Sequence, residues 1–282
     1  MSDVPSRDLR DLDDPVVVVA FGGWNDAGSA ATGAVEHLSE VYEAESVFAI
    51  DPDDFYDFQV NRPEVKLDED DDRELTWPTT ELQIAELPAG RPLVLVHGLE
   101  PNLRWRQFCT LVTSALKSAS TKRVHLLGAL LADTPHTRPI PVSTSTGNRE
   151  LMTSMGLAPS TYEGPTGIVG VLADALERSG VEVLSSWAAV PHYVSHPPCP
   201  KATLALLSQL EQVLDTPLEL GELPELARAW ERGVDELAAE DSEVAEYVTS
   251  LEQQQDATDL PEASGEVIAA EFERYLRRRQ GH

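Results

Sequence analysis

The chain has 282 residues, of which 41% are hydrophobic and 25% are charged, and its formal net charge is −28. Its length and apolar content suffice for one large domain plus a smaller unit, and they exclude a wholly disordered chain. The strong negative charge repels phosphate backbones and anionic lipids, which excludes a general nucleic-acid binder and a membrane-surface protein. No apolar run reaches the ~20 residues that a membrane-spanning helix needs.

The first 14 residues are polar and acidic, and we expect a flexible tail there. They contain no apolar segment of the kind found in secretory signals. Two cysteines, Cys109 and Cys199, do not make a disulfide framework. We therefore expect a cytoplasmic protein.

Apolar runs alternate with helix-spaced segments between residues 15 and 216. The run Val16–Phe21 is continuously apolar, which is typical of a strand buried on both faces of a parallel sheet. An edge strand is expected over 139–145, because its prolines cannot donate to a neighbouring strand. Further strands are expected at 46–50, 74–77, 82–87, 92–97, 123–131 and 181–187, and helices at 27–41, after Pro101, at 166–179 and at 201–214.

This alternation predicts an α/β fold: a three-layer α/β/α sandwich with a mainly parallel sheet over residues 15–216. The acidic segment 51–72 is expected to be a solvated loop. After residue 216 the apolar residues recur with helical spacing over 223–237, 244–251 and 268–276. We therefore expect a helical appendage of three helices over 217–282.

The first candidate site is the turn at Gly22 and Gly23, followed by Trp24, Asn25 and Asp26. A glycine turn between a strand and a helix exposes backbone N–H groups, which attract anions. However, the turn matches neither the dinucleotide nor the P-loop glycine pattern. It also has no lysine, and Asp26 would oppose a phosphate. Two interpretations stay open: a structural turn, or a contact for a ligand or partner.

The second candidate site combines Asp133, His136 and Arg138 directly after a buried strand. Ligands of open α/β sheets bind at the carboxyl ends of the strands. These side chains could polarise a substrate or bind a carboxylate. Equally, they could lock their own loop by hydrogen bonds.

The third candidate site is the turn around Glu163 and Thr166, which precedes a helix. Thr166 could cap that helix, and Glu163 could act as an acid, a base or a capping partner. His192, His196 and Cys199 have a spacing that suggests a metal site, but the surrounding prolines prevent a helix that would align them. We therefore predict no metal.

Catalytic signatures are missing from the sequence. There is no G-x-S-x-G nucleophile elbow, and neither cysteine has an identifiable base near it in the sequence. A serine or cysteine hydrolase is not supported, no cofactor is predicted, and the sequence leans away from an enzyme.

Three pieces of the chain together carry a family resemblance. They are residues 21–31, beginning Phe-Gly-Gly-Trp-Asn-Asp-Ala-Gly, residues 98–102, Gly-Leu-Glu-Pro-Asn, and residues 162–167, Tyr-Glu-Gly-Pro-Thr-Gly. Their order and spacing resemble the proteasome assembly chaperone 2 family, in its actinobacterial branch, over roughly residues 15–215. The Pro-His-Thr-Arg-Pro stretch at 135–139 is similar to that branch as well.

This resemblance implies a sandwich similar to nucleoside phosphorylase and hydrolase folds, and self-association. Archaeal and eukaryotic relatives look like chaperones that help to build proteasome rings. Some carry a C-terminal hydrophobic-Tyr-any residue motif, which the segment Leu276–His282 lacks. Docking through such a tail is therefore not expected.

We favour a non-catalytic assembly-chaperone-like or binding protein with a proteasome-related partner. An enzyme or small-molecule binder that uses the cleft at the strand ends is the alternative, and a purely structural homo-oligomer is the third hypothesis. We expect a homo-oligomer, with a trimer favoured over a dimer. The candidate contact residues are Gly22, Gly23, Trp24, Asn25, Asp26, Glu100, Asp133, His136, Arg138, Glu163 and Thr166.

Overall fold

The apolar run near the N-terminus forms β1 (Val16–Gly22), the middle strand of a seven-stranded sheet. In this computed structural model the described residues are 8–67, 72–194 and 196–259. β1 pairs in parallel with β6 (Arg91–Leu99) along its whole length, from Val16 opposite Leu93 to Gly22 opposite Leu99. On its other side β1 pairs in parallel with β7 (Arg123–Ala132).

The sheet has the strand order β2-β5-β6-β1-β7-β9-β8. β9 (Glu182–Pro191) runs parallel to β7, so β6, β1, β7 and β9 form a parallel centre. β5 (Thr80–Leu87) is antiparallel to β6 and to β2 (Glu45–Ala49), and β8 (Val142–Ser145) is antiparallel to β9. β8 lies at an edge, as predicted, although it begins only after Pro139 and Pro141. The α/β fold with a mainly parallel sheet is confirmed.

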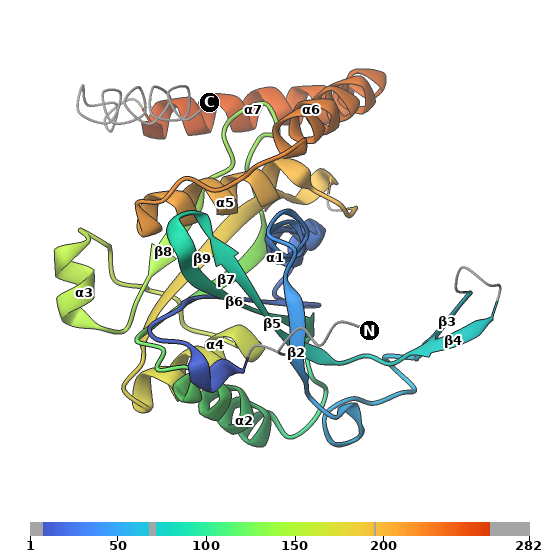
Figure 1. Ribbon diagram of the computed structural model, residues 1–282. Helices are drawn as coiled ribbons and strands as arrows, with labels where there is room; N and C mark the ends of the chain where they lie inside the picture. Colours follow the sequence, from blue (N-terminus) through green and yellow to red (C-terminus); the bar gives the residue numbers. More distant parts are fainter. Residues whose placement is uncertain (1–7, 68–71, 195, 260–282) are drawn as a thin grey trace.

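Figure 1 shows α1 and α5 on one side of the sheet and α2 and α4 on the other. Alternate residues of β1 face these two layers of helices. Val17, Val19 and Phe21 lie in the core with α2 (Trp105–Ser118) and α4 (Ile168–Arg178). Val16, Val18 and Ala20 lie in the core with α1 (Ala30–Val41) and α5 (Pro200–Leu214). Every residue of β1 from Val16 to Phe21 is buried, because both faces of the strand are covered.

The start of the described chain is attached to the domain. Residues Leu9–Asp11 form the 3-10 turn η1, and the Leu9 side chain is buried in the core. Asp14 forms an ion pair with Lys122 at 2.9 Å. Residues 8–14 therefore differ from the expected flexible tail, since Leu9 supplies an apolar anchor, and residues 1–7 of that tail lie outside the described residues.

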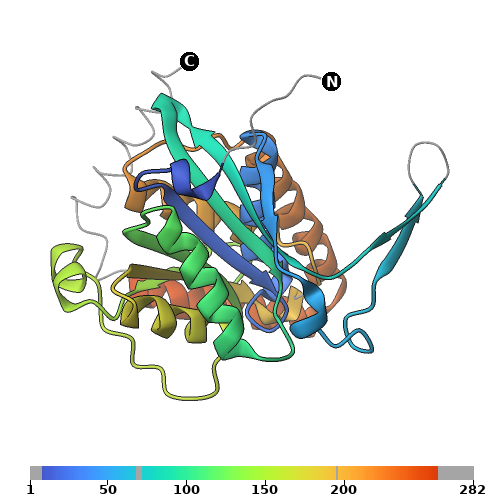
Figure 2. The same cartoon turned by 60° about the horizontal axis from the view of Figure 1, so that its bottom comes forward.

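The expected loop over 51–72 is wrong in part. After the 3-10 turn η3 (Pro52–Asp54), β3 (Glu64–Leu67) pairs antiparallel with β4 (Arg73–Thr76) as a separate two-stranded ribbon. Val65 lies opposite Leu75, and this cross-strand apolar pair favours the strand pairing. Figure 2 shows the ribbon projecting from the body of the molecule.

Shorter elements complete the domain. They are η2 (Ala27–Ser29), η4 (Pro88–Gly90), α3 (Arg149–Ser154) and η5 (His192–Val194).

Two helices follow the domain: α6 (Leu223–Glu240), which packs on α5, and α7 (Ser242–Asp259), which packs on α6. Figure 1 shows both stacked beyond α5, on the outside of that layer. The third helix of the appendage, expected over 268–276, lies outside the described residues. Within the described residues, no helix is both long and apolar enough to cross a bilayer.

Candidate functional site

The four parallel strands end at one edge of the sheet, at Leu99, Gly22, Ala132 and Pro191. The candidate residues follow these strand ends, but the structure divides them into two groups. The first group, which we name the lock, consists of Asn25, Glu100, Gly167 and Ile168. The second, which we name the clamp, consists of Asp133, His136 and Arg138 with their partners on η5, α5, α6 and α7.

The lock joins the three segments on which the family resemblance rests. The Asn25 side-chain N–H donates to Glu100 Oε1 at 2.9 Å, and the backbone N–H of Ile168 donates to the same oxygen at 2.7 Å. Asn25 is only 1% exposed. Its backbone carbonyl accepts from Ala129 of β7 at 2.8 Å. The loop after β1 is therefore bonded to β7, to the segment after β6 and to the start of α4.

Glu100 acts as the cap of α4 from a different segment of the chain. The N-cap residue of α4 is Gly167, which has no capping side chain, so the carboxylate of Glu100 accepts the first free N–H of the helix. A negative charge at this position also favours the helix dipole. The expectation that Thr166 caps α4 is wrong, because its hydroxyl points to the Gly167 carbonyl at 3.5 Å. Glu163 lies exposed on the turn before it, outside the lock.

Gly167 is required by its close approach to Asn25. A Cβ atom added at Gly167 would lie 2.2 Å from Nδ2 and 2.5 Å from Oδ1 of Asn25. Oδ1 of Asn25 is buried without a hydrogen-bond partner. The glycine thus lets the start of α4 close over the amide, and any larger residue would push the two apart.

Asp26 serves the next helix rather than a ligand. Its Oδ1 accepts from the backbone N–H of Ala31 at 2.7 Å, and its Oδ2 accepts from the Thr32 hydroxyl. Burial raises the pKa of Asp26, although these hydrogen bonds favour its charged form.

Trp24 stands between the buried Asn25 and the glycine turn, and its side chain is 65% exposed. Gly23 adopts a φ of +124°, which favours glycine and turns the chain outward at this point. Exposed apolar side chains border the turn on both sides: Leu99 packs against Gly22, and Leu130 follows Ala129, which is bonded to the loop. The lock therefore presents a tryptophan to solvent from a fixed loop.

The clamp begins at His136, which is 1% exposed. Its Nδ1 and its backbone N–H each lie 2.8 Å from the Tyr193 hydroxyl, and its Nε2 lies 3.1 Å from Asp235 of α6. Lys201 at the start of α5 donates to the His136 carbonyl and to Glu231 of α6. His136 is thus enclosed between the domain and the appendage.

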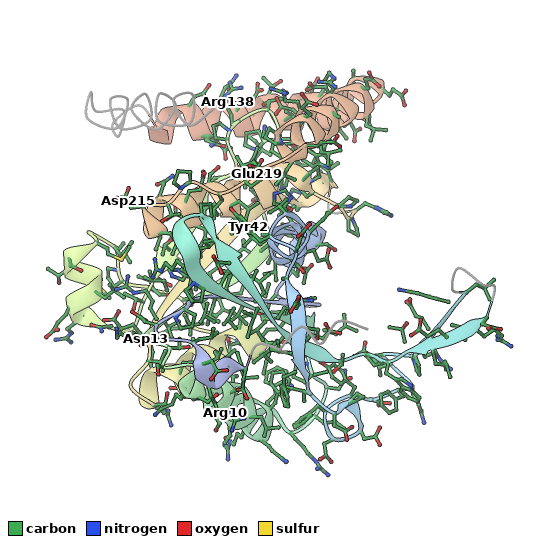
Figure 3. The ribbon with its side chains drawn as sticks, viewed as in Figure 1. Arg10, Asp13, Tyr42, Arg138, Asp215 and Glu219 are labelled. Carbon is green, nitrogen blue, oxygen red and sulfur yellow. The ribbon has the colours of Figure 1, made fainter. Side chains whose placement is uncertain are left out.

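Arg138 and Asp133 bind α7. Arg138, labelled in Figure 3, donates through Nε and Nη2 to the two carboxylate oxygens of Asp256, at 2.8 and 2.9 Å, and through Nη1 to Glu252 at 3.1 Å. The guanidinium holds the pKa of Asp256 below its ordinary value. Asp133 accepts from the Tyr247 hydroxyl at 3.1 Å and pairs with His192 at 3.2 Å. These contacts attach the appendage to the loop after β7.

The polar candidates therefore do not converge on one pocket. Glu100 belongs to the lock, Glu163 is exposed outside it, and the charged residues of the loop after β7 bind the appendage. Two cavities, of about 420 and 460 Å³, lie away from these residues, one at the root of the β3–β4 ribbon and one between η1, β2 and α2. Over the described part of the chain, no three His, Cys, Asp or Glu side chains are grouped as metal ligands.

The partners of the clamp were not candidates in the sequence. They are Tyr193, Lys201, Glu231, Asp235, Tyr247, Glu252 and Asp256. Asp235, Glu252 and Asp256 lie about a hundred residues from the loop that they bind, and Glu231 binds Lys201, in a chain with 49 Asp and Glu residues. Nothing local distinguishes them from solvated carboxylates.

A family model described as the PAC2 family matches residues 20–238. The chain belongs to the PAC2 family. Two solved structures of this kind are similar to it over most of their length. A PAC2 family protein from Streptomyces avermitilis is 54% identical, with 83% of this chain and 100% of that chain covered and a TM-score of 0.78.

The second is a proteasome-assembly chaperone homologue from Mycobacterium tuberculosis, 49% identical, with 83% and 99% of the two chains covered and a TM-score of 0.76. An archaeal proteasome activator from Pyrococcus furiosus is 16% identical, with 80% and 94% covered and a TM-score of 0.64, and shares the fold. A comparison with curated proteins gives no match. The resemblance noted in the sequence is thus confirmed at the level of the PAC2 family.

Proposed function

We propose that this PAC2 family chain is a non-catalytic, assembly-chaperone-like protein of the cytoplasm that binds a proteasome-related protein through Trp24. The observation that carries the proposal is the exposed Trp24 beside a lock built from all three resemblance segments. The side chain of Trp24 is 65% exposed. Most of its apolar surface therefore remains in water, and burying that surface against a partner would be favourable. Tryptophan, with tyrosine and arginine, is enriched among the few residues that carry most of the binding energy at protein interfaces.

Rigidity of the loop supports this assignment. Asn25 is bonded to Glu100 and to Ala129, so the backbone that carries Trp24 is held in place before a partner arrives. A preorganised loop loses little conformational entropy on binding, and binding is tighter for that reason. Leu99 at the end of β6, and Leu130 and Leu131 near the end of β7, are 41%, 45% and 51% exposed, so exposed apolar residues also occur at the ends of the two strands beside β1.

The chemistry of the site supports binding rather than catalysis. In the lock, Glu100 Oε1 already accepts two hydrogen bonds from the chain. In the clamp, His136 and Arg138 are held by α6 and α7. The relatives described as a proteasome-assembly chaperone homologue and a proteasome activator support this class of partner. Self-association, with a trimer favoured over a dimer, stays part of the proposal.

The test is a pull-down with the full chain from native lysate at low salt, followed by mass spectrometry. Trp24→Ala is compared with Trp77→Ala, a matched control because Trp77 is also exposed, at 45%, but lies beside the β3–β4 ribbon. Proteasome subunits retained by the wild type and by Trp77→Ala, and lost with Trp24→Ala, would support the proposal. Equal recovery with both variants, or no proteasome subunit with the wild type, would overturn it.

A further inference from the structure

α7 lies over the cationic side chain of the loop after β7. Arg138 pairs with Glu252 and Asp256 of α7, at 3.1 and 2.8 Å, and the hydroxyl of Thr137 donates to Glu252. The chain has 21 Lys and Arg residues against 49 Asp and Glu residues, so a cation that binds two carboxylates at once is a local exception to the charge of the whole chain. What this loop binds in the structure is one face of an acidic helix.

The face of α7 that meets the loop has a definite pattern. Glu252 and Asp256 are four positions apart, so their carboxylates lie on one side of the helix, one turn from each other. Tyr247 precedes them, and its hydroxyl donates to Asp133 at 3.1 Å. α7 contains no Lys or Arg that could pair with its own carboxylates. The loop therefore recognises one hydroxyl and two carboxylates on a helix without cations.

Little buried apolar surface attaches α7. Its buried apolar residues are Val248 and Leu251, and it packs on α6, whereas α5 in the domain buries six residues. The side chains that bind the loop, such as Asp256, stay partly exposed. Ion pairs at exposed positions contribute little stability and are weakened by salt. The contacts of α7 with the loop are thus ones that a competing helix can replace.

α6 is held more firmly than α7. Lys201 of α5 donates to Glu231 of α6, and four other residues of α6 are buried. The buried His136 lies 3.1 Å from Asp235 of the same helix. Asp241 is the single residue between the two helices, and its backbone is extended, with φ −124° and ψ 111°. A change at this residue moves α7 away from the loop while α6 stays on the domain.

We propose that the loop after β7 is a binding site for an acidic helix of a partner protein, and that α7 occupies this site in the free chain. The partner helix carries two carboxylates one turn apart, which Arg138 binds as it binds Glu252 and Asp256. The site goes beyond the proposed binding through Trp24, and it does not depend on that contact. Because α7 competes for the site, the affinity for the partner falls in proportion to the fraction of chains in which α7 is released.

The net charge of −28 does not prevent such binding. At physiological salt the Debye length is about 8 Å, so carboxylates elsewhere on the surface are largely screened from an incoming helix. Arg138 acts at hydrogen-bond distance, where screening is weaker, and a guanidinium binds a carboxylate with two parallel hydrogen bonds. The local cation therefore determines which helix binds here.

The experiment uses the full chain at 0.15 M NaCl and a labelled peptide of residues 242–259, and it measures binding by fluorescence anisotropy. Glu252→Gln with Asp256→Asn, which we name the release variant, removes the two charges of the chain's own helix and keeps the shape of both side chains. We expect the peptide to bind the release variant at least tenfold more tightly than the wild type. Hydrogen exchange in α7 of the release variant should be several-fold faster.

Two further substitutions in the release variant locate the site. Arg138→Gln should weaken binding of the peptide at least tenfold. Arg178→Gln is the matched control, because it removes the same charge from an exposed ion pair at the end of α4, and it should leave the affinity unchanged. A peptide that itself carries Glu252→Gln and Asp256→Asn should lose at least tenfold in affinity for the release variant.

Three results contradict the proposal. The first is a peptide that binds the release variant no better than the wild type, which includes no binding to either. The second is binding that persists after Arg138→Gln, since the peptide would then lie elsewhere. The third is α7 in the release variant with unchanged hydrogen exchange, because the ion pairs with the loop would then not be what holds the helix.

Discussion

The lock and the clamp lie at the same edge of the sheet, but they use different chemistry. The lock is made of a buried amide, one carboxylate and backbone N–H groups, packed around a glycine. The clamp is made of charged side chains that reach from a loop to two helices and stay partly exposed, such as Arg138 with Asp256. Packing determines the strength of the first, whereas salt and pH act on the second.

The difference shows that the charged residues that suggest catalysis in the sequence have a structural role in the fold. Asp133, His136 and Arg138 are the strongest catalytic suggestion in the sequence, yet all three bind other parts of the chain. The uncharged Trp24, in contrast, is left to solvent by a loop that is fixed on both sides. In this chain the charged residues attach the appendage to the domain, and the exposed tryptophan is the residue left available to a partner.

The largest expected effect is a loss of stability caused by a substitution inside the lock. Gly167→Ala should destabilise the protein by about 3 kcal/mol, since its Cβ would overlap the Asn25 carboxamide. Urea unfolding at pH 7.5 measures this loss. In an Asn25→Ala background the same substitution should be much milder, because the overlapping atoms are gone. A loss that is equal in both backgrounds would show that the contact with Asn25 is not its cause.

The next effect is a dependence of stability on pH, and it arises from a residue that belongs neither to the lock nor to the clamp. His125 in β7 is buried, and burial, helped by the charges of Arg123 and Arg91, lowers its pKa to about 4. The unfolded chain therefore binds a proton on this residue at a higher pH than the folded chain does. Stability is complete above pH 6.5 and is lost as pH falls toward 4. Between pH 7.5 and 5 we expect a loss of about 2 kcal/mol from this group.

Urea unfolding at the two pH values tests this, with His125→Gln as the comparison. The variant should show a shallower pH dependence by that amount. An identical dependence in both proteins would assign the acid sensitivity to other groups, the clamp among them.

A smaller effect is expected from a substitution that weakens only the clamp. Arg138→Gln removes the ion pairs with Asp256 and Glu252 and should let α7 open locally. Hydrogen exchange in α7 should then be several-fold faster, while exchange in β1 stays as in the wild type. Salt at 1 M should act on the wild type in the same direction by screening. Unchanged exchange in α7 would show that packing on α6 holds the helix.

The smallest effect is expected at Trp24. Because the side chain is 65% exposed, Trp24→Ala should change the free energy of unfolding by no more than about 0.5 kcal/mol. Thermal and urea unfolding measure this directly. A larger loss would mean that the indole stabilises the domain itself, and the surface assigned to partner binding would have to be reconsidered.

The central strands could be predicted because burial on both faces leaves a continuous apolar run, as in Val16–Phe21. The edge position of β8 could be predicted from Pro139 and Pro141, which directly precede it. β3 could not, because its four residues are exposed and lie in an acidic segment with no core face to create a pattern. In the lock, Asn25 and Glu100 were candidates, but their joint role depends on contacts between segments 75 residues apart. The clamp depends on contacts between segments about a hundred residues apart, beyond any local periodicity.

The contacts between α7 and the loop after β7 determine how the appendage responds to a pulling force. α7 is tied to the loop after β7 by successive contacts along its length, from Tyr247 through Glu252 to Asp256. A pull on the C-terminal end of α7 loads Asp256 first and the others in turn, so the helix peels. β1, in contrast, is bonded to parallel neighbours on both sides, and moving it lengthwise requires many backbone bonds to shear together. A load on the C-terminal side will therefore remove the appendage before it disturbs the sheet.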